Sequence, residues 1–124
     1  MIRYVMIAVG GALGAIARYL VAAMIQARVP AGFPWGTFWV NVSGSLLMGA
    51  AMTLLTERLV TNSQWRFLIP IGFIGAYTTF STFEWELFSA NAEGAWLTGA
   101  SYLVGSVVAG YVALWLGILL ARSL

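Results

Sequence analysis

The sequence has no cysteine, histidine, lysine or aspartate. Without cysteine it can form no disulfide, and without histidine it lacks the usual zinc ligand and the base of a Ser-His-Asp triad. Without lysine it can form neither a Schiff base nor a Walker-type phosphate loop. The remaining charged side chains are arginines and glutamates scattered along the chain. These absences argue against an enzyme and against a nucleic-acid-binding patch.

Charge is scarce altogether. Charged residues make up 8% of the chain, whereas a soluble domain has about 25%. Hydrophobic residues make up 61%, so the expected solvent is lipid. A helix needs about 20 apolar residues to cross a bilayer. The sequence therefore predicts an all-α, multi-pass membrane protein, a single transmembrane domain over residues 1–124. Its four expected spans are residues 4–25, 36–55, 65–88 and 96–121.

The segments between the expected spans are short and rich in turn-forming residues. They are residues 28–32, 61–63 and 91–94, and the second offers N-cap residues for the third helix. Residues 1–17 could alternatively be a signal peptide, with Arg3 in its basic region and a cleavage site at residues 15–17. The apolar run continues past Arg18, however, so we favour a first span.

Polar side chains recur at helical spacing in three of the expected spans. Each set places its members on one face of a helix. The sets are Thr37, Asn41 and Ser45; Thr79, Thr82 and Glu86; and Tyr102, Ser106 and Gly110. A buried amide such as that of Asn41 needs partners, because leaving it unpaired costs several kcal/mol. One such stripe is more typical of helix packing, whereas three together favour a polar path.

The third expected span carries several residues that weaken a helix. Pro70 cannot donate a backbone hydrogen bond, and Gly72 and Gly75 are poor helix formers. We therefore expect this helix to be broken near residues 75–79, with a new helix starting near Thr79 and its positive dipole end facing the break. Carbonyl groups freed inside a membrane need a cation or a cavity to satisfy them.

The groups along the expected path suit an anion better than a cation. They are hydroxyls, one amide and two phenylalanines, Phe80 and Phe83, whereas Glu84 and Glu86 are expected toward the far end. A phenyl ring is positive at its edge, so two rings placed edge-on could attract a small anion. Core packing of both rings is the alternative, and periodicity leaves it open. We predict a weakly binding anion path in which donors replace hydration.

Three stretches form recognisable motifs: GGALGAIARY at residues 10–19, GTFWVNVSG at 36–44 and GFIGAYTTFSTFE at 72–84. They resemble motifs of the Fluc (CrcB) fluoride channel family. The third is highly specific, whereas the first would be weak alone. The resemblance implies a passive channel that exports fluoride from the cytoplasm across a bacterial inner membrane. It also implies small four-helix subunits that pair as an antiparallel, dual-topology homodimer with two pores.

The resemblance further implies roles for individual residues. Gly75 and Thr78 would give backbone carbonyls to a central structural Na⁺, and Arg18 would lie in a wide aqueous vestibule. Gly110 departs from the pattern, since some relatives carry a hydroxyl there. The residues implied along the fluoride path are Asn41, Phe80, Phe83, Thr79, Ser81, Thr82, Tyr102 and Ser106.

Two other functions fit a small four-helix membrane protein. A small multidrug exporter has a similar size and topology, but it needs a membrane-embedded glutamate in its first span. The first span here has no acidic residue and carries Arg18 instead. A bundle that transports nothing, such as an assembly subunit, is the second alternative. Ion flux through the purified protein separates both from a channel.

Overall fold

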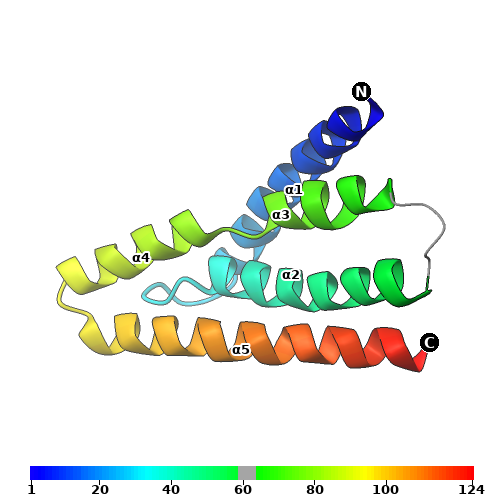
Figure 1. Cartoon of the computed structure of the whole chain (residues 1–124). Helices are drawn as coiled ribbons and strands as arrows, with labels where there is room; N and C mark the ends of the chain where they lie inside the picture. The colour runs from blue at the N-terminus through cyan, green and yellow to red at the C-terminus, as the bar shows by residue number, and fades with distance from the viewer. Residues whose placement is uncertain (59–63) are drawn as a thin grey trace.

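The computed structural model describes residues 1–58 and 64–124, and its regular secondary structure there is helical throughout (Figure 1). Within these residues, three helical stretches are long and apolar enough to cross a membrane: Ile2–Gln26, Trp35–Glu57 and Trp96–Ser123. The elements are α1 (Ile2–Gln26), α2 (Trp35–Thr53), the π-helices η1 (Leu54–Arg58) and η2 (Phe67–Ile74), α3 (Gly75–Tyr77), α4 (Phe80–Ala92) and α5 (Trp96–Ser123). The caps expected at residues 61–63 lie outside the described residues.

Helices α2 and α5 form the most extensive helix pair, with α5 along one edge of the molecule (Figure 1). They run side by side along most of their length, α1 crosses at an angle and packs against η2, and α4 lies along the first part of α5 (Figure 1). Few large apolar side chains are buried, and many on α1 and α5 are exposed. An apolar outer surface of this kind fits a lipid environment or contact with another membrane helix.

Glycines set the distance between helices. A Cβ on Gly10 or Gly14 would overlap the backbone of η2, at the carbonyl oxygens of Leu68 and Phe73. A Cβ on Gly49 would overlap the α5 backbone in the same way. Small residues allow membrane helices to approach closely enough for van der Waals packing. These glycines therefore serve packing rather than an ion path.

The third expected span consists of three successive elements. Helix α3 ends at Tyr77, and the backbone of Thr78 (ψ 156°) and Thr79 (φ −147°, ψ 123°) is extended. Helix α4 then begins at Phe80. The Thr79 hydroxyl caps it by accepting a hydrogen bond from the Thr82 N–H at 3.3 Å, which satisfies one of the donors that a helix N-terminus leaves unpaired.

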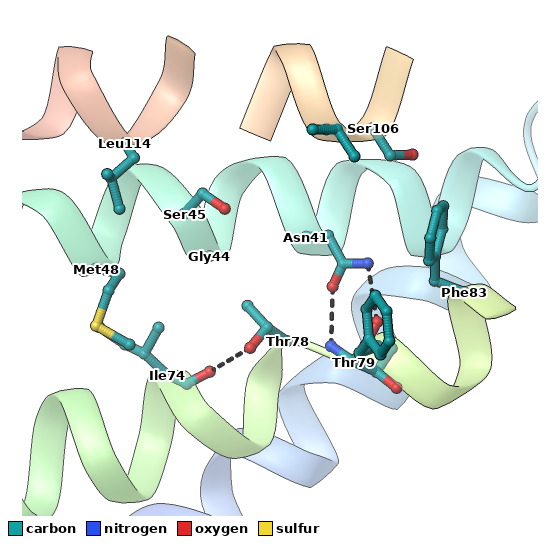
Figure 2. Close-up of a pocket in the computed structure, with 12 residues that line it drawn as sticks. Asn41, Gly44, Ser45, Met48, Ile74, Thr78, Thr79, Phe83, Ser106 and Leu114 are labelled. Atoms are coloured by element: carbon teal, nitrogen blue, oxygen red, sulfur yellow. Dashed lines mark hydrogen bonds between the residues drawn. The ribbon is translucent and has the colours of Figure 1, made fainter. Parts of the chain in front are cut away.

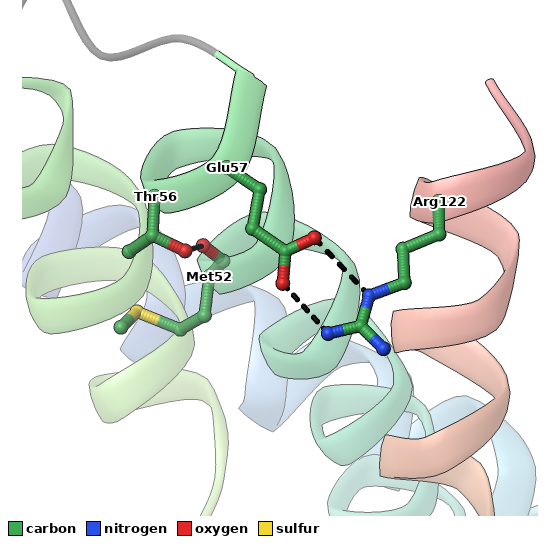
Figure 3. Close-up of polar contacts among 4 residues, drawn as sticks. All are labelled: Met52, Thr56, Glu57 and Arg122. Atoms are coloured by element: carbon green, nitrogen blue, oxygen red, sulfur yellow. Dashed lines mark hydrogen bonds and ion pairs between the residues drawn. The ribbon is translucent and has the colours of Figure 1, made fainter.

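An ion pair joins the end of η1 to the end of α5 (Figure 3). The Arg122 guanidinium donates to both oxygens of Glu57, through Nη2 at 2.7 Å and Nε at 3.1 Å. Both side chains are largely exposed, and exposed pairs contribute little to stability. The pair marks the end of the bundle that is remote from the polar residues described next.

Candidate functional site

A cavity of about 310 Å³ lies where α2 and α5 face the extended residues of the third segment (Figure 2). We call it the central cavity. Six of the residues expected along the path or at the cation line it: Asn41, Thr78, Thr79, Phe80, Phe83 and Ser106. The other lining residues are small or apolar, apart from Ser45. The fold thus gathers groups from three segments that are far apart in the sequence.

Asn41 holds the extended backbone in place. Its Nδ2 donates to the Thr79 carbonyl oxygen at 3.0 Å, and its Oδ1 accepts from the Thr79 N–H at 2.8 Å (Figure 2). A side-chain amide has two N–H donors, and Thr79 uses one of them. Asn41 can therefore fix the backbone and still offer a donor to the central cavity.

A second donor in the central cavity is unused. The Ser106 hydroxyl oxygen is buried and has no hydrogen-bond partner among the described residues. A buried polar group normally has a partner, because leaving it unpaired costs about 1–3 kcal/mol. An orphan hydroxyl in a cavity thus indicates a place where a ligand, ion or water is bound.

Two aromatic rings line the same cavity. The centroids of Phe80 and Phe83 are 6.0 Å apart, with their planes at 37°. Phe83 is buried, whereas Phe80 is 71% exposed in the single chain. Phe83 is thus packed inside the chain while it lines the cavity, whereas the single chain leaves Phe80 largely uncovered.

A neighbouring cavity of about 410 Å³ has a more polar lining. We call it the Arg18 cavity, because Arg18 lines it together with Gln26, Thr37, Thr82 and Glu86. Arg18 forms no ion pair within residues 1–58 and 64–124, although Glu86 lines the same space. Thr79 lines both cavities, so the two are adjacent.

Glu86 belongs to a polar network that the sequence analysis did not anticipate. Its Oε1 accepts from the Thr37 hydroxyl at 2.8 Å, and its Oε2 accepts from the Tyr102 hydroxyl at 2.7 Å. The sequence analysis placed Glu86 toward the far end of a path without acidic groups. The helical spacing of Thr79, Thr82 and Glu86 did indicate that Glu86 belongs to the site, because Thr82 and Glu86 line the same cavity.

Three of the expected residues lie outside both cavity linings. The Tyr102 side chain is 0% exposed, and its ring packs against Phe83 with centroids 4.9 Å apart. Ser81 and Gly75 are exposed on the surface of the single chain. Tyr102 thus lies next to the central cavity. Ser81 and Gly75 would take part in an ion-binding site only if a second chain packed against them.

The extended residues free backbone carbonyls at the end of α3, and those of Gly75 and Thr78 are among them. In a continuous helix the Gly75 carbonyl would accept from the Thr79 N–H, and the Thr78 carbonyl from the Thr82 N–H. The Thr79 N–H instead donates to Asn41, and the Thr82 N–H donates to the Thr79 hydroxyl. Both carbonyls thus lose their helical donors to side chains.

These features define a small helical membrane protein with a donor-lined cavity beside an interrupted segment. Comparison with known proteins gives the family. The profile of the family described as "CrcB-like protein, Camphor Resistance (CrcB)" matches residues 5–118. The chain belongs to this family, which confirms the resemblance.

Relatives share most of their length with this chain. A protein of Solibacter usitatus is 52% identical over 97% of this chain and 98% of its own. One of Acidobacterium capsulatum is 45% identical over 98% of each chain, and one of Geobacter metallireducens is 42% identical over all of both. Each is named "Fluoride-specific ion channel FluC". The name describes an ion channel and not an enzyme.

Proposed function

We propose that this protein is a fluoride-selective passive channel that lets fluoride leave the cytoplasm across a bacterial inner membrane. The observation that carries the proposal is the unpartnered Ser106 hydroxyl in a cavity that Asn41 and two phenyl rings also line. Hydroxyl and amide donors with ring edges can replace the hydration shell of a small anion. The names of the relatives support fluoride as that anion.

Arg18 would attract fluoride toward the central cavity without lining it. It is a cation without an ion-pair partner in the described part of the chain, and it lines the cavity next to the central one. A positive charge in a cleft raises the local concentration of anions. The Arg18 cavity would therefore be the vestibule through which fluoride reaches the central cavity.

The proposal includes an antiparallel homodimer with two pores. Phe80 lines the central cavity and is 71% exposed in the single chain, so one copy alone leaves this side of the path open to lipid. A second, inverted copy would cover the open side and contribute residues to each pore. In that arrangement η2, α3 and α4 would cross the membrane as one interrupted segment.

A structural Na⁺ would suit the Gly75 and Thr78 carbonyls, which are among those freed at the interruption. Gly75 is exposed, and a Cβ there would meet only the Pro70 carbonyl oxygen within 4 Å among the described residues. The Gly75 and Thr78 carbonyls of two copies would thus supply four oxygens to one cation. Bound there, Na⁺ would neutralise carbonyl dipoles in a low-dielectric interior and tie the copies together.

Reconstitution in liposomes tests the function and separates its rivals. We expect purified protein to release loaded fluoride down its gradient, with no need for a proton gradient. An exporter would require a proton gradient, and a bundle without transport would release no more fluoride than empty liposomes do. Either result would overturn the channel assignment.

A further inference from the structure

The Gln26 side chain makes two hydrogen bonds across the connection between α1 and α2, beside a backbone bond from the Trp35 N–H to the Phe33 carbonyl oxygen at 2.9 Å. Gln26, the last residue of α1, donates from Nε2 to the Phe33 carbonyl oxygen at 3.3 Å. Its Oε1 accepts from the Gly36 N–H at 3.2 Å. The two bonds span the loop of residues 27–34 and fix where Phe33 lies relative to both helices.

The Phe33 ring belongs to an aromatic cluster at this end of the bundle. Its centroid lies 4.4 Å from that of Trp35, 6.0 Å from that of Phe38 and 5.3 Å from that of Tyr102. The contact with Tyr102 is edge-to-face, at 77°, a favoured aromatic geometry. The loop therefore reaches Tyr102 through the ring of Phe33, whose carbonyl oxygen accepts hydrogen bonds from the Gln26 side chain and the Trp35 N–H.

Tyr102 connects this cluster to both cavities. Its ring lies against Phe33 and against Phe83, which lines the central cavity. Its hydroxyl donates to Glu86, which lines the Arg18 cavity. Tyr102 is 0% exposed, so contacts with its neighbours decide its position. Tyr102 thus connects Phe33 to one group in each cavity.

We propose that Phe33, held by Gln26, is a positioning residue for the anion path and acts through Tyr102. The proposal rests on the channel function proposed above and adds a loop residue that lines neither cavity. The Phe33 ring holds Tyr102 in one position, and Tyr102 in turn holds Phe83 and Glu86. Without it, Tyr102 gains room to rotate, and the path loses its fixed geometry.

The test compares Phe33→Leu, Phe33→Tyr and a control, Phe88→Leu, by fluoride efflux from proteoliposomes. Phe88 is 62% exposed and its ring pairs with that of Trp85, and it has no ring pair with Tyr102 among the described residues. Losing one edge-to-face pair changes an equilibrium by up to about tenfold. We expect Phe33→Leu to slow fluoride efflux about five- to tenfold. Phe33→Tyr, which keeps the ring, and Phe88→Leu should stay within about twofold of the wild type.

A second variant covers the case in which Phe33→Leu does not fold. Gln26→Met keeps the length of the side chain and removes both hydrogen bonds, so it should slow efflux and raise the fluoride concentration at half-maximal flux. Gln26 also lines the Arg18 cavity, so a double variant with the milder Phe33→Met separates an effect through Phe33 from an effect on the cavity; where Phe33→Leu folds, it serves in the same way. If Gln26 acts through Phe33, the double variant is no slower than the Phe33 variant alone.

The possible results distinguish a failure of the Phe33 positioning role from a failure of the proposed channel function. A wild type that conducts while Phe33→Leu and Gln26→Met conduct equally well would overturn the positioning role and leave the channel intact. Equal losses in Phe33→Leu and Phe88→Leu would also overturn it, since the effect would then be general. A wild type that releases no fluoride would overturn both.

Discussion

Replacing Asn41 by alanine removes both hydrogen bonds that hold the extended backbone at Thr79. Thr79 is 8% exposed, so its N–H and carbonyl would lose their partners while buried. Each unpaired group costs about 1–3 kcal/mol, and the two together come to roughly 2–6 kcal/mol. This is a large part of the 5–15 kcal/mol or so by which a typical protein is stable. We therefore expect Asn41→Ala to unfold at a lower temperature and to conduct poorly.

Asn41→Asp separates the structural role from the conducting one. The carboxylate keeps an acceptor for the Thr79 N–H, loses both amide donors and places a negative charge in the central cavity. Two unit charges 4 Å apart interact by about 4 kcal/mol at an effective dielectric constant of 20. That corresponds to about a thousandfold in rate. Fluoride efflux should thus fall more steeply in Asn41→Asp than in Asn41→Ala.

Two measurements check this pair of variants. A fluoride electrode records efflux from proteoliposomes, and size-exclusion chromatography after heating records how much protein stays folded. Ser123→Ala is a suitable control, because its hydroxyl bonds only locally, to the Leu120 carbonyl oxygen. Wild-type efflux from Asn41→Asp would refute the path through Asn41. Wild-type stability of Asn41→Ala would refute its role at Thr79.

Three further predictions concern other parts of the structure. Phe80→Leu should slow fluoride efflux about tenfold or more by removing a ring edge from the central cavity; efflux like that of wild type would place Phe80 outside the path. Replacing Na⁺ by a much larger organic cation should impair assembly or flux, and indifference to the exchange would remove the Gly75 and Thr78 carbonyls from the cation site. Gly49→Leu should destabilise the protein by about 1–3 kcal/mol or more by forcing α2 from α5, and an unchanged unfolding temperature would contradict the close packing seen at Gly49.

The long helices could be predicted from hydropathy alone. The expected spans at residues 4–25, 36–55 and 96–121 match α1, α2 and α5 to within about two residues at most ends, because apolar runs of this length have few other folded forms in lipid. The third span was harder to predict. Pro70 and the neighbouring glycines signalled a weak helix, but hydropathy does not predict a π-helix at Phe67–Ile74 or extended residues at Thr78 and Thr79.

The polar faces were predictable, whereas their partners were not. Helical spacing placed Asn41 on one stripe and Thr79 on another, but their contact spans 38 residues of sequence and depends on how the helices pack. The same limit applies to Glu86, whose carboxylate pairs with Thr37 and Tyr102 from two other helices. Periodicity gives the face of a helix, and tertiary packing decides what that face meets.

The most direct test of the central claim is the ratio of fluoride to chloride efflux from proteoliposomes loaded with both ions and containing only this protein. If hydrogen-bond donors and ring edges replace the hydration shell of a small anion, fluoride should be released much faster than chloride. Chloride release should stay near the rate of empty liposomes. Equal release of the two anions, or of neither, would contradict the account.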